Sequence, residues 1–168
     1  MTTQRQQDLQ RIAYQERSLV FSAFDKGTAW ELGQRLRAFC EAKGVATTIE
    51  VRLARETVFL YAMPGTAANN ADWARRKRNV VEMMDRSSYG VGLSGKEEGI
   101  SMEAAMGLPL GDYACHGGGF PLTVRGVGVV GVVTVSGLPE REDHIMVVQV
   151  LAELCGIDPA EVALDPAG

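Results

Sequence analysis

Two pairs of apolar segments, each pair joined by a very short turn, constrain the fold most strongly. In the first pair, residues 48–53 alternate polar and apolar side chains, and after a brief turn residues 57–63 run back. In the second pair, residues 122–125 and 127–135 turn near Gly126. Parallel neighbouring strands need a long crossover connection, so strands this close in sequence form antiparallel hairpins. A doubly wound parallel sheet is therefore excluded.

Segments with helical periodicity separate these hairpins. Residues 28–43 place apolar side chains three and four positions apart, with Asp25 as the expected cap and Gly44 as the stop. Further amphipathic helices are predicted over residues 73–86 and 140–155. The remaining expectations are a short N-terminal helix, a strand over residues 18–24, a loop over residues 87–95 and a short helix over residues 97–106. We expect an α/β (α+β) fold with one five-stranded, mainly antiparallel sheet flanked by helices.

Composition limits the class of protein. The chain has 168 residues, of which 46% are hydrophobic and 23% charged, so residues 1–168 are expected to form a single globular domain. A net charge of -4 argues against a nucleic-acid partner. The three cysteines show no Cys-x-x-Cys pair, and no secretory leader or membrane-spanning stretch is apparent. We expect a cytoplasmic protein with free thiols and no membrane partner.

Several familiar catalytic and nucleotide-binding motifs are matched only superficially. Residues 126–131 read Gly-x-Gly-x-x-Gly, but a strand follows them where a dinucleotide site needs a helix, which favours close strand packing. Residues 90–96 imitate a phosphate-binding loop, but Glu97 replaces the Ser or Thr that would hold magnesium. No Gly-x-Ser-x-Gly elbow and no second metal-ligand pair accompany Cys115 and His116. We therefore assign no catalytic residue and no metal site.

Lys77 stands out on the helix predicted over residues 73–86. It lies four residues after Trp73 and four before Val81, in the middle of the apolar stripe. An unpaired buried ammonium is costly, so Lys77 must snorkel to water, pair with a carboxylate or face an anionic ligand. Arg76 adds a second positive charge that one structural carboxylate would not balance. For that reason we favour the anion-facing pocket.

The two histidines have different surroundings. His144 begins the apolar stripe of the last helix, a position where histidine usually packs and hydrogen-bonds in the core. His116 instead precedes a run in which backbone can approach a ligand closely, although tight-turn geometry also accounts for the glycines. That run consists of Gly117, Gly118, Gly119 and Phe120, followed by Pro121.

Taken together, these segments resemble the haem-degrading-domain family, which includes HbpS-like and GlcG-like proteins and the C-terminal domain of PduO-type corrinoid adenosyltransferases. The chain is most similar to a subgroup of bacterial and fungal proteins. The resemblance implies a profilin-like layered fold and a homo-oligomer built from dimers. It is carried by Phe24-Asp25, Ala29, Leu32-Gly33, residues 59–65, Asn70, Trp73, Arg76-Lys77, Val80-Val81, residues 116–121, Gly131, residues 134–138 and Glu142-Asp143-His144.

Two functions from different classes remain open. In the first, the protein binds an anionic planar cofactor such as haem, with weak or no catalysis. His116 or His144 would then be the axial donor, Lys77 and Arg76 would meet the propionates, and Trp73 would lie in the same pocket. In the second, the protein is a non-catalytic oligomeric scaffold or adaptor, with the strand over residues 126–137 near a dimer axis.

Overall fold

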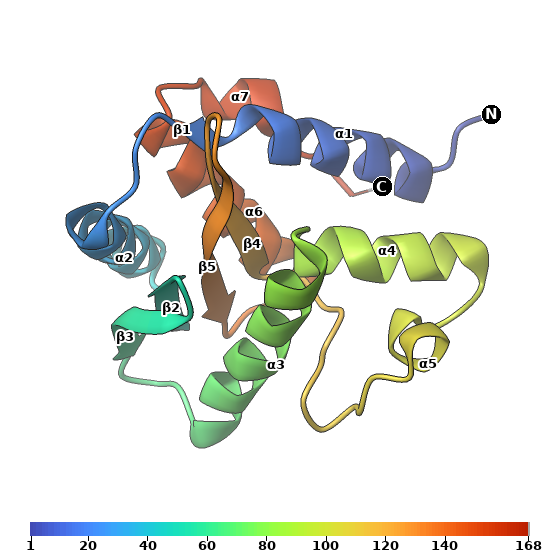
Figure 1. Cartoon of the computed structure of the whole chain (residues 1–168), viewed down its shortest axis with the longest axis horizontal. Coiled ribbons are helices and arrows are strands. Elements are labelled where there is room, and N and C mark those ends of the chain that lie inside the picture. Colours follow the sequence, from blue (N-terminus) through green and yellow to red (C-terminus); the bar gives the residue numbers. More distant parts are fainter. Residues whose placement is uncertain (168) are drawn as a thin grey trace.

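The computed structural model describes residues 1–167, which form one five-stranded sheet with helices on both faces (Figure 1). Adjacent strands are antiparallel, except for the first two in the spatial order, which are parallel. The expected five-stranded, mainly antiparallel sheet is confirmed, and one edge pair makes it a mixed sheet. The spatial order is β1 (Val20–Phe21), β4 (Gly119–Val124), β5 (Gly128–Ser136), β2 (Thr48–Leu53) and β3 (Glu56–Ala62).

The helices form layers around this sheet. One face is covered by two long helices, the other by a third, and the N-terminal helix packs beside α4 (Figure 1). Leu32 and Leu36 from α2 and Leu151 from α6 belong to the main hydrophobic core. The helices are α1 (Gln4–Ser18), α2 (Lys26–Lys43) and α6 (Glu140–Leu154) with the short α7 (Pro159–Val162), then α3 (Ala68–Met84) on the opposite face with α4 (Ser88–Glu98) and α5 (Met102–Met106).

Both predicted hairpins are present. In the first, Ile49 of β2 pairs with Tyr61 of β3, and in the second β4 and β5 turn through Gly126 at a φ of +76°. Gly131 lies against β2, where a Cβ atom would be 2.2 Å from the carbonyl oxygen of Arg52. The Gly-x-Gly-x-x-Gly segment is thus a turn and a tightly packed strand, as the sequence indicated.

The prediction of a loop over residues 87–95 is wrong, because helix α4 occupies most of that segment. The Ser87 hydroxyl accepts a hydrogen bond from the Gly90 N–H and begins the helix. A Cβ atom at Gly92 would be 2.0 Å from the Cys115 carbonyl oxygen, so this glycine permits close helix packing. Tertiary contacts therefore outweigh the low helix propensity of glycine. The residues that imitate a phosphate-binding loop lie inside this helix.

The strand expected over residues 18–24 is reduced to Val20–Phe21. Helix α1 continues to Ser18, and Asp25 already caps α2, so little chain is left to pair with β4. The N-cap role of Asp25 and the left-handed stop at Gly44 are confirmed. The short helix α7 was not predicted.

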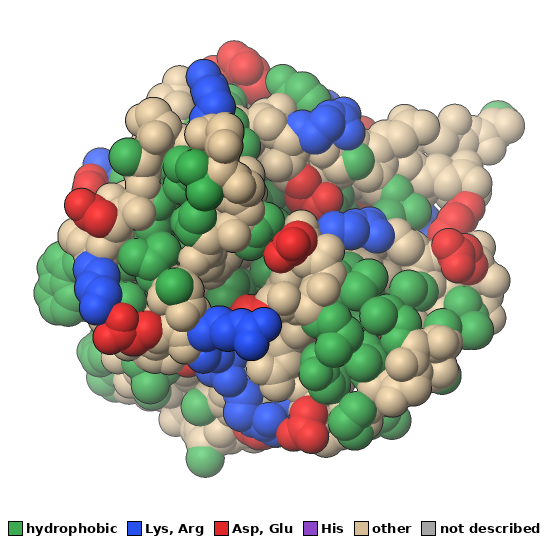
Figure 2. Space-filling model, viewed as in Figure 1, with side chains coloured by type: hydrophobic (Ala, Val, Ile, Leu, Met, Phe, Trp, Pro, Cys, Tyr) green, Lys and Arg blue, Asp and Glu red, His purple; other side chains and the backbone are tan. Residues whose placement is uncertain are grey.

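The chain's own helices cover part of β5. Strand β5 lies inside the sheet, and residues 132–136 are buried by the chain's own helices, whereas Val127 and Val129 near its start are exposed. Figure 2 shows hydrophobic side chains at the surface over the region of α4 and α5. Ile100, Met106 and Leu110 are exposed there.

Within residues 1–167, no helix is long and apolar enough to cross a membrane.

Candidate functional site

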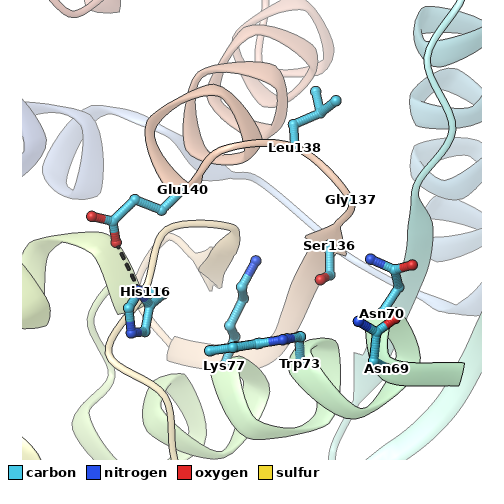
Figure 3. Close-up of a pocket in the computed structure, with 9 residues that line it drawn as sticks. All are labelled: Asn69, Asn70, Trp73, Lys77, His116, Ser136, Gly137, Leu138 and Glu140. Atoms are coloured by element: carbon cyan, nitrogen blue, oxygen red, sulfur yellow. Dashed lines mark ion pairs between the residues drawn. The ribbon is translucent and has the colours of Figure 1, made fainter. Parts of the chain in front are cut away.

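A pocket of about 240 Å³, lined mostly by residues with polar side chains, lies where the first turns of α3 meet the connection from β5 to α6 (Figure 3). Three of the residues expected at a ligand site line it, namely Trp73, Lys77 and His116. Arg76, the three glycines, Phe120 and His144 do not line it. The other lining residues are Asn69, Asn70, Ser136, Gly137, Leu138 and Glu140.

Lys77 is 4% exposed and forms a buried ion pair. Its Nζ lies 3.0 Å from Asp143 Oδ2 and donates a second hydrogen bond to the Val135 carbonyl oxygen at 3.2 Å. Burial raises the pKa of Asp143, while the Lys77 ammonium opposes that shift. Of the three alternatives for Lys77, the structure therefore shows pairing with a carboxylate, that of Asp143.

The charge of Arg76 does not add to that of Lys77 as the sequence argument assumed. The Arg76 guanidinium carbon lies 4.4 Å from the centre of the Trp73 ring, in cation–π geometry. One carboxylate is therefore enough to balance Lys77. Trp73 itself stays half-buried and lines the pocket.

His116 and Glu140 stand at the side of the pocket (Figure 3). His116 Nδ1 lies 3.2 Å from Glu140 Oε2, and the imidazole meets the Trp73 ring edge-on at 5.2 Å. Lys96 approaches the other carboxylate oxygen at 2.9 Å. The contact with His116, followed by that with Lys96, lowers the pKa of Glu140 to about 2, against the opposing effect of burial. Glu140 is thus an anion at neutral pH and lies beside the His116 ring.

The glycine run after His116 packs against the chain itself and leaves no room for a ligand. A Cβ atom at Gly117 would be 2.0 Å from the Glu140 carbonyl oxygen, and one at Gly118 would be 2.3 Å from that of Val135. Gly119 donates its N–H to the Ser88 hydroxyl at 3.0 Å. Of the two explanations for these glycines, ligand approach and tight-turn geometry, the structure contains the turn, with Gly118 at a φ of +134°, and packs it closely against the chain.

His144 and Phe120 belong to the core. His144 is buried, and its Nε2 lies 2.8 Å from Gln15 Oε1. Because the Gln15 amide group donates to the Val162 carbonyl oxygen, its Oε1 accepts, and His144 Nε2 carries the proton. Burial lowers the pKa of His144 to about 3, so the ring is neutral at neutral pH. The packing interpretation of His144 holds, and this ring does not reach the pocket.

Comparison with known proteins shows the family to which this chain belongs. The family model for haem-degrading HbpS-like proteins matches residues 24–152. The chain belongs to the HbpS-like family. The chain is also 53% identical over 158 residues to a UPF0303 protein of Azotobacter vinelandii, covering 94% of this chain and 95% of that protein. A UPF0303 protein of Serratia proteamaculans is 46% identical over 150 residues, covering 89% and 93%.

Solved structures of this HbpS-like fold are more distant in sequence. The Ybr137w protein superposes with a TM-score of 0.78 at 24% identity, covering 88% of this chain and 87% of its own. The PduOC:heme complex gives a TM-score of 0.67 at 16% identity, covering 77% and 94%. Streptomyces reticuli HbpS gives 0.64 at 16% identity, covering 80% and 88%. These likenesses establish the shared fold.

Sequence reasoning missed most of the polar lining of the pocket. Asn70 and residues 136–138 belonged to the segments that carry the family resemblance, which is the signal that could have singled them out. Glu140 appeared only as the first residue of a helix, and nothing in the sequence connected it with His116. Their contact joins α6 to the segment before β4 and depends on the packed fold.

Proposed function

We propose that this protein binds a small molecule at the His116 pocket, with haem or a related anionic tetrapyrrole as the ligand and weak or no catalysis. The observation that carries this proposal is the contact between His116 and Glu140. A carboxylate on one imidazole nitrogen orients the ring and leaves the other nitrogen available to a metal. Within residues 1–167, no side chain hydrogen-bonds to His116 Nε2, and the ring is about half exposed.

The chemistry of the pocket would suit a nitrogen ligand for haem iron. His116 Nε2 would hold the iron, and Glu140 would keep the imidazole in the required orientation. Haem, when bound, supplies iron that can bind oxygen or exchange an electron. His144 is not a second candidate, because its Nε2 is engaged by Gln15 in the core.

The size of the pocket limits how such a ligand is held. A cavity of about 240 Å³ is smaller than the roughly 300–1,000 Å³ typical of sites that enclose drug-sized ligands. The macrocycle would therefore remain partly outside the cavity. Trp73 and the Arg76 guanidinium beside it would contribute an aromatic surface and a positive charge.

Haem titration of the purified protein tests this proposal. We expect a shifted Soret band in the wild-type protein and, in His116→Ala, an affinity lower by about tenfold or more. Glu140→Gln should weaken binding less, because it removes only the orienting charge. His144→Gln is the matched control for loss of a histidine and should bind like the wild type. Equal haem affinity in His116→Ala and wild type would overturn the proposal.

A second candidate is a non-catalytic homo-oligomeric scaffold, favoured by the exposed edge at β3. This strand has β2 as its neighbour on one side, and its other edge is unpaired within residues 1–167. Leu60 of this strand and Trp30 of α2 are 62% and 57% exposed, and both line a hollow of about 510 Å³ together with Phe59. Open strand edges with apolar neighbours favour pairing with another chain.

Light scattering separates the two candidates. A homo-oligomer built from dimers through this edge should be larger than 18.1 kDa at micromolar concentration. Leu60→Lys should shift it toward the monomer, whereas Leu110→Lys, at an exposed site away from the edge, should not. A wild-type monomer would exclude the scaffold.

We further propose that residues 1–168 act as one domain and that the protein is cytoplasmic, as its free thiols suggest.

A further inference from the structure

The inner end of the pocket contains a hydroxyl group that faces the cavity and has no protein partner among the described residues. Ser136 is 3% exposed, lines the cavity, and makes no side-chain hydrogen bond to any residue within 1–167. Figure 3 shows its oxygen directed toward the middle of the pocket, where the Lys77 side chain also ends. Because this hydroxyl faces the cavity and has no partner among the described residues, its O–H is free to donate to a ligand there.

Lys77 offers a second donor at the same place. Its ammonium group has three N–H bonds, and the structure accounts for two of them, to Asp143 and to the Val135 carbonyl oxygen. The Asp143 carboxylate in turn accepts from the backbone N–H groups of Gly137 and Leu138. Asp143 is thus held by three donors, and the third N–H of Lys77 is available to the pocket.

The remaining polar lining is also rich in donors. Asn70 Oδ1 accepts from the Ala67 N–H at 2.9 Å, which leaves the amide N–H bonds of Asn70 free. The acidic lining residue, Glu140, is neutralised by Lys96 and lies against His116. A site that presents an ammonium, a hydroxyl and an amide to one cavity suits a ligand with several acceptor oxygens and a negative charge.

We infer that the inner end of the pocket is a carboxylate subsite, in which Lys77 Nζ and the Ser136 hydroxyl donate to the two oxygens of one carboxylate. The small cavity admits a carboxylate on a short chain. Two sources supply that group, a free small organic acid or a propionate side chain of haem. The inference deepens the proposed function, since both use the same pocket, but it stands independently of iron ligation by His116.

Propionate, with propionamide as the uncharged control of the same shape, tests the subsite. We expect millimolar propionate to shift the backbone amide NMR signals of residues 136–138, and propionamide to leave them unchanged. Ser136→Ala removes the hydroxyl and should weaken propionate binding about tenfold. Ser94→Ala is the matched control, because that hydroxyl hydrogen-bonds within α4 outside the pocket. The double variant Lys77→Gln with Asp143→Asn removes both charges, avoids a stranded carboxylate, and should abolish binding.

Haem and its dimethyl ester distinguish this inference from the proposed function. Tighter binding of haem than of the ester, lost in Ser136→Ala, would identify the propionate as an occupant. Propionate binding without haem binding would support a free acid and overturn the haem proposal alone. Equal binding of haem and ester, with no effect of propionate, would overturn the carboxylate subsite and leave the haem proposal standing. Unchanged propionate affinity in Ser136→Ala would overturn the role given to that hydroxyl.

Discussion

Lys77 of α3 and Asp143 of α6 form an ion pair across the end of the sheet, with 3.0 Å between Nζ and Oδ2. The two residues are 66 positions apart in sequence, and their side chains are 5% and 0% exposed. The pair therefore connects the helices on opposite faces of the sheet directly beneath the pocket. Its strength as a structural element can be measured separately from ligand binding.

Lys77→Met should destabilise the protein by about 3–5 kcal/mol, because it leaves the Asp143 carboxylate buried without its countercharge. Denaturant unfolding of the variant measures this change. Arg75→Met on the same helix is the control, since Arg75 pairs with Asp72 and Asp112 at the surface. Its cost should be no more than about 1 kcal/mol. A Lys77→Met protein as stable as the wild type would contradict the structural role of the pair.

His144 should make the fold sensitive to acid. Its pKa is lowered from 6.5 to about 3 in the folded protein, so the unfolded chain binds the proton more readily between these values. The stability contributed by the neutral ring is complete above about pH 6.5 and is lost as the pH falls toward 3. Between pH 7 and pH 4 this loss is on the order of 3 kcal/mol.

Urea unfolding at several pH values measures that loss. His144→Gln should flatten the decline of stability below pH 6.5, since glutamine has no proton to gain there. His116→Gln changes the other histidine, which is half exposed, and serves as the control. An unchanged slope of stability against pH in His144→Gln would show that another group titrates.

Gly117 should not tolerate a side chain. Gly117→Ala places a Cβ atom 2.0 Å from the Glu140 carbonyl oxygen, so the segment before β4 must move away from α6. We expect a loss of about 1–3 kcal/mol or more in the free energy of unfolding. Gly111→Ala meets no atom within 4 Å and should leave stability nearly unchanged. Similar thermal midpoints for both variants would contradict the close packing of this turn.

The cysteines should react slowly in the folded protein. Burial raises the pKa of Cys115 to about 12 and that of Cys155 to about 11, so little thiolate exists at pH 8. We expect labelling by a thiol reagent to be at least about tenfold slower than in denaturant, and thermal stability to be the same with and without reductant. Intact mass after air oxidation provides the check, and an intramolecular disulfide would be the opposing result.

Much of the architecture could be predicted because it depends on neighbours a few residues apart. Asp25 and Thr28 cap α2 through contacts three residues apart, and Gly44 ends it at a φ of +67° that other residues rarely adopt. The two hairpins likewise follow from short turns between apolar segments. Pattern and turn chemistry alone were enough to determine these elements and the mainly antiparallel sheet.

Contacts distant in sequence decided the rest. The apolar stripe placed Lys77 at a buried position, but only the packing of α6 against the sheet brought Asp143 to it. The sequence favoured core packing for His144, but only the packing of α1 supplied its partner Gln15, 129 positions away, while His116 came to line the pocket. Helix α4 formed from a Gly-rich segment because the missing Cβ of Gly92 lets it touch the Cys115 backbone. Local sequence sets which residues can be buried, whereas the partner of each buried group depends on how the layers close around it.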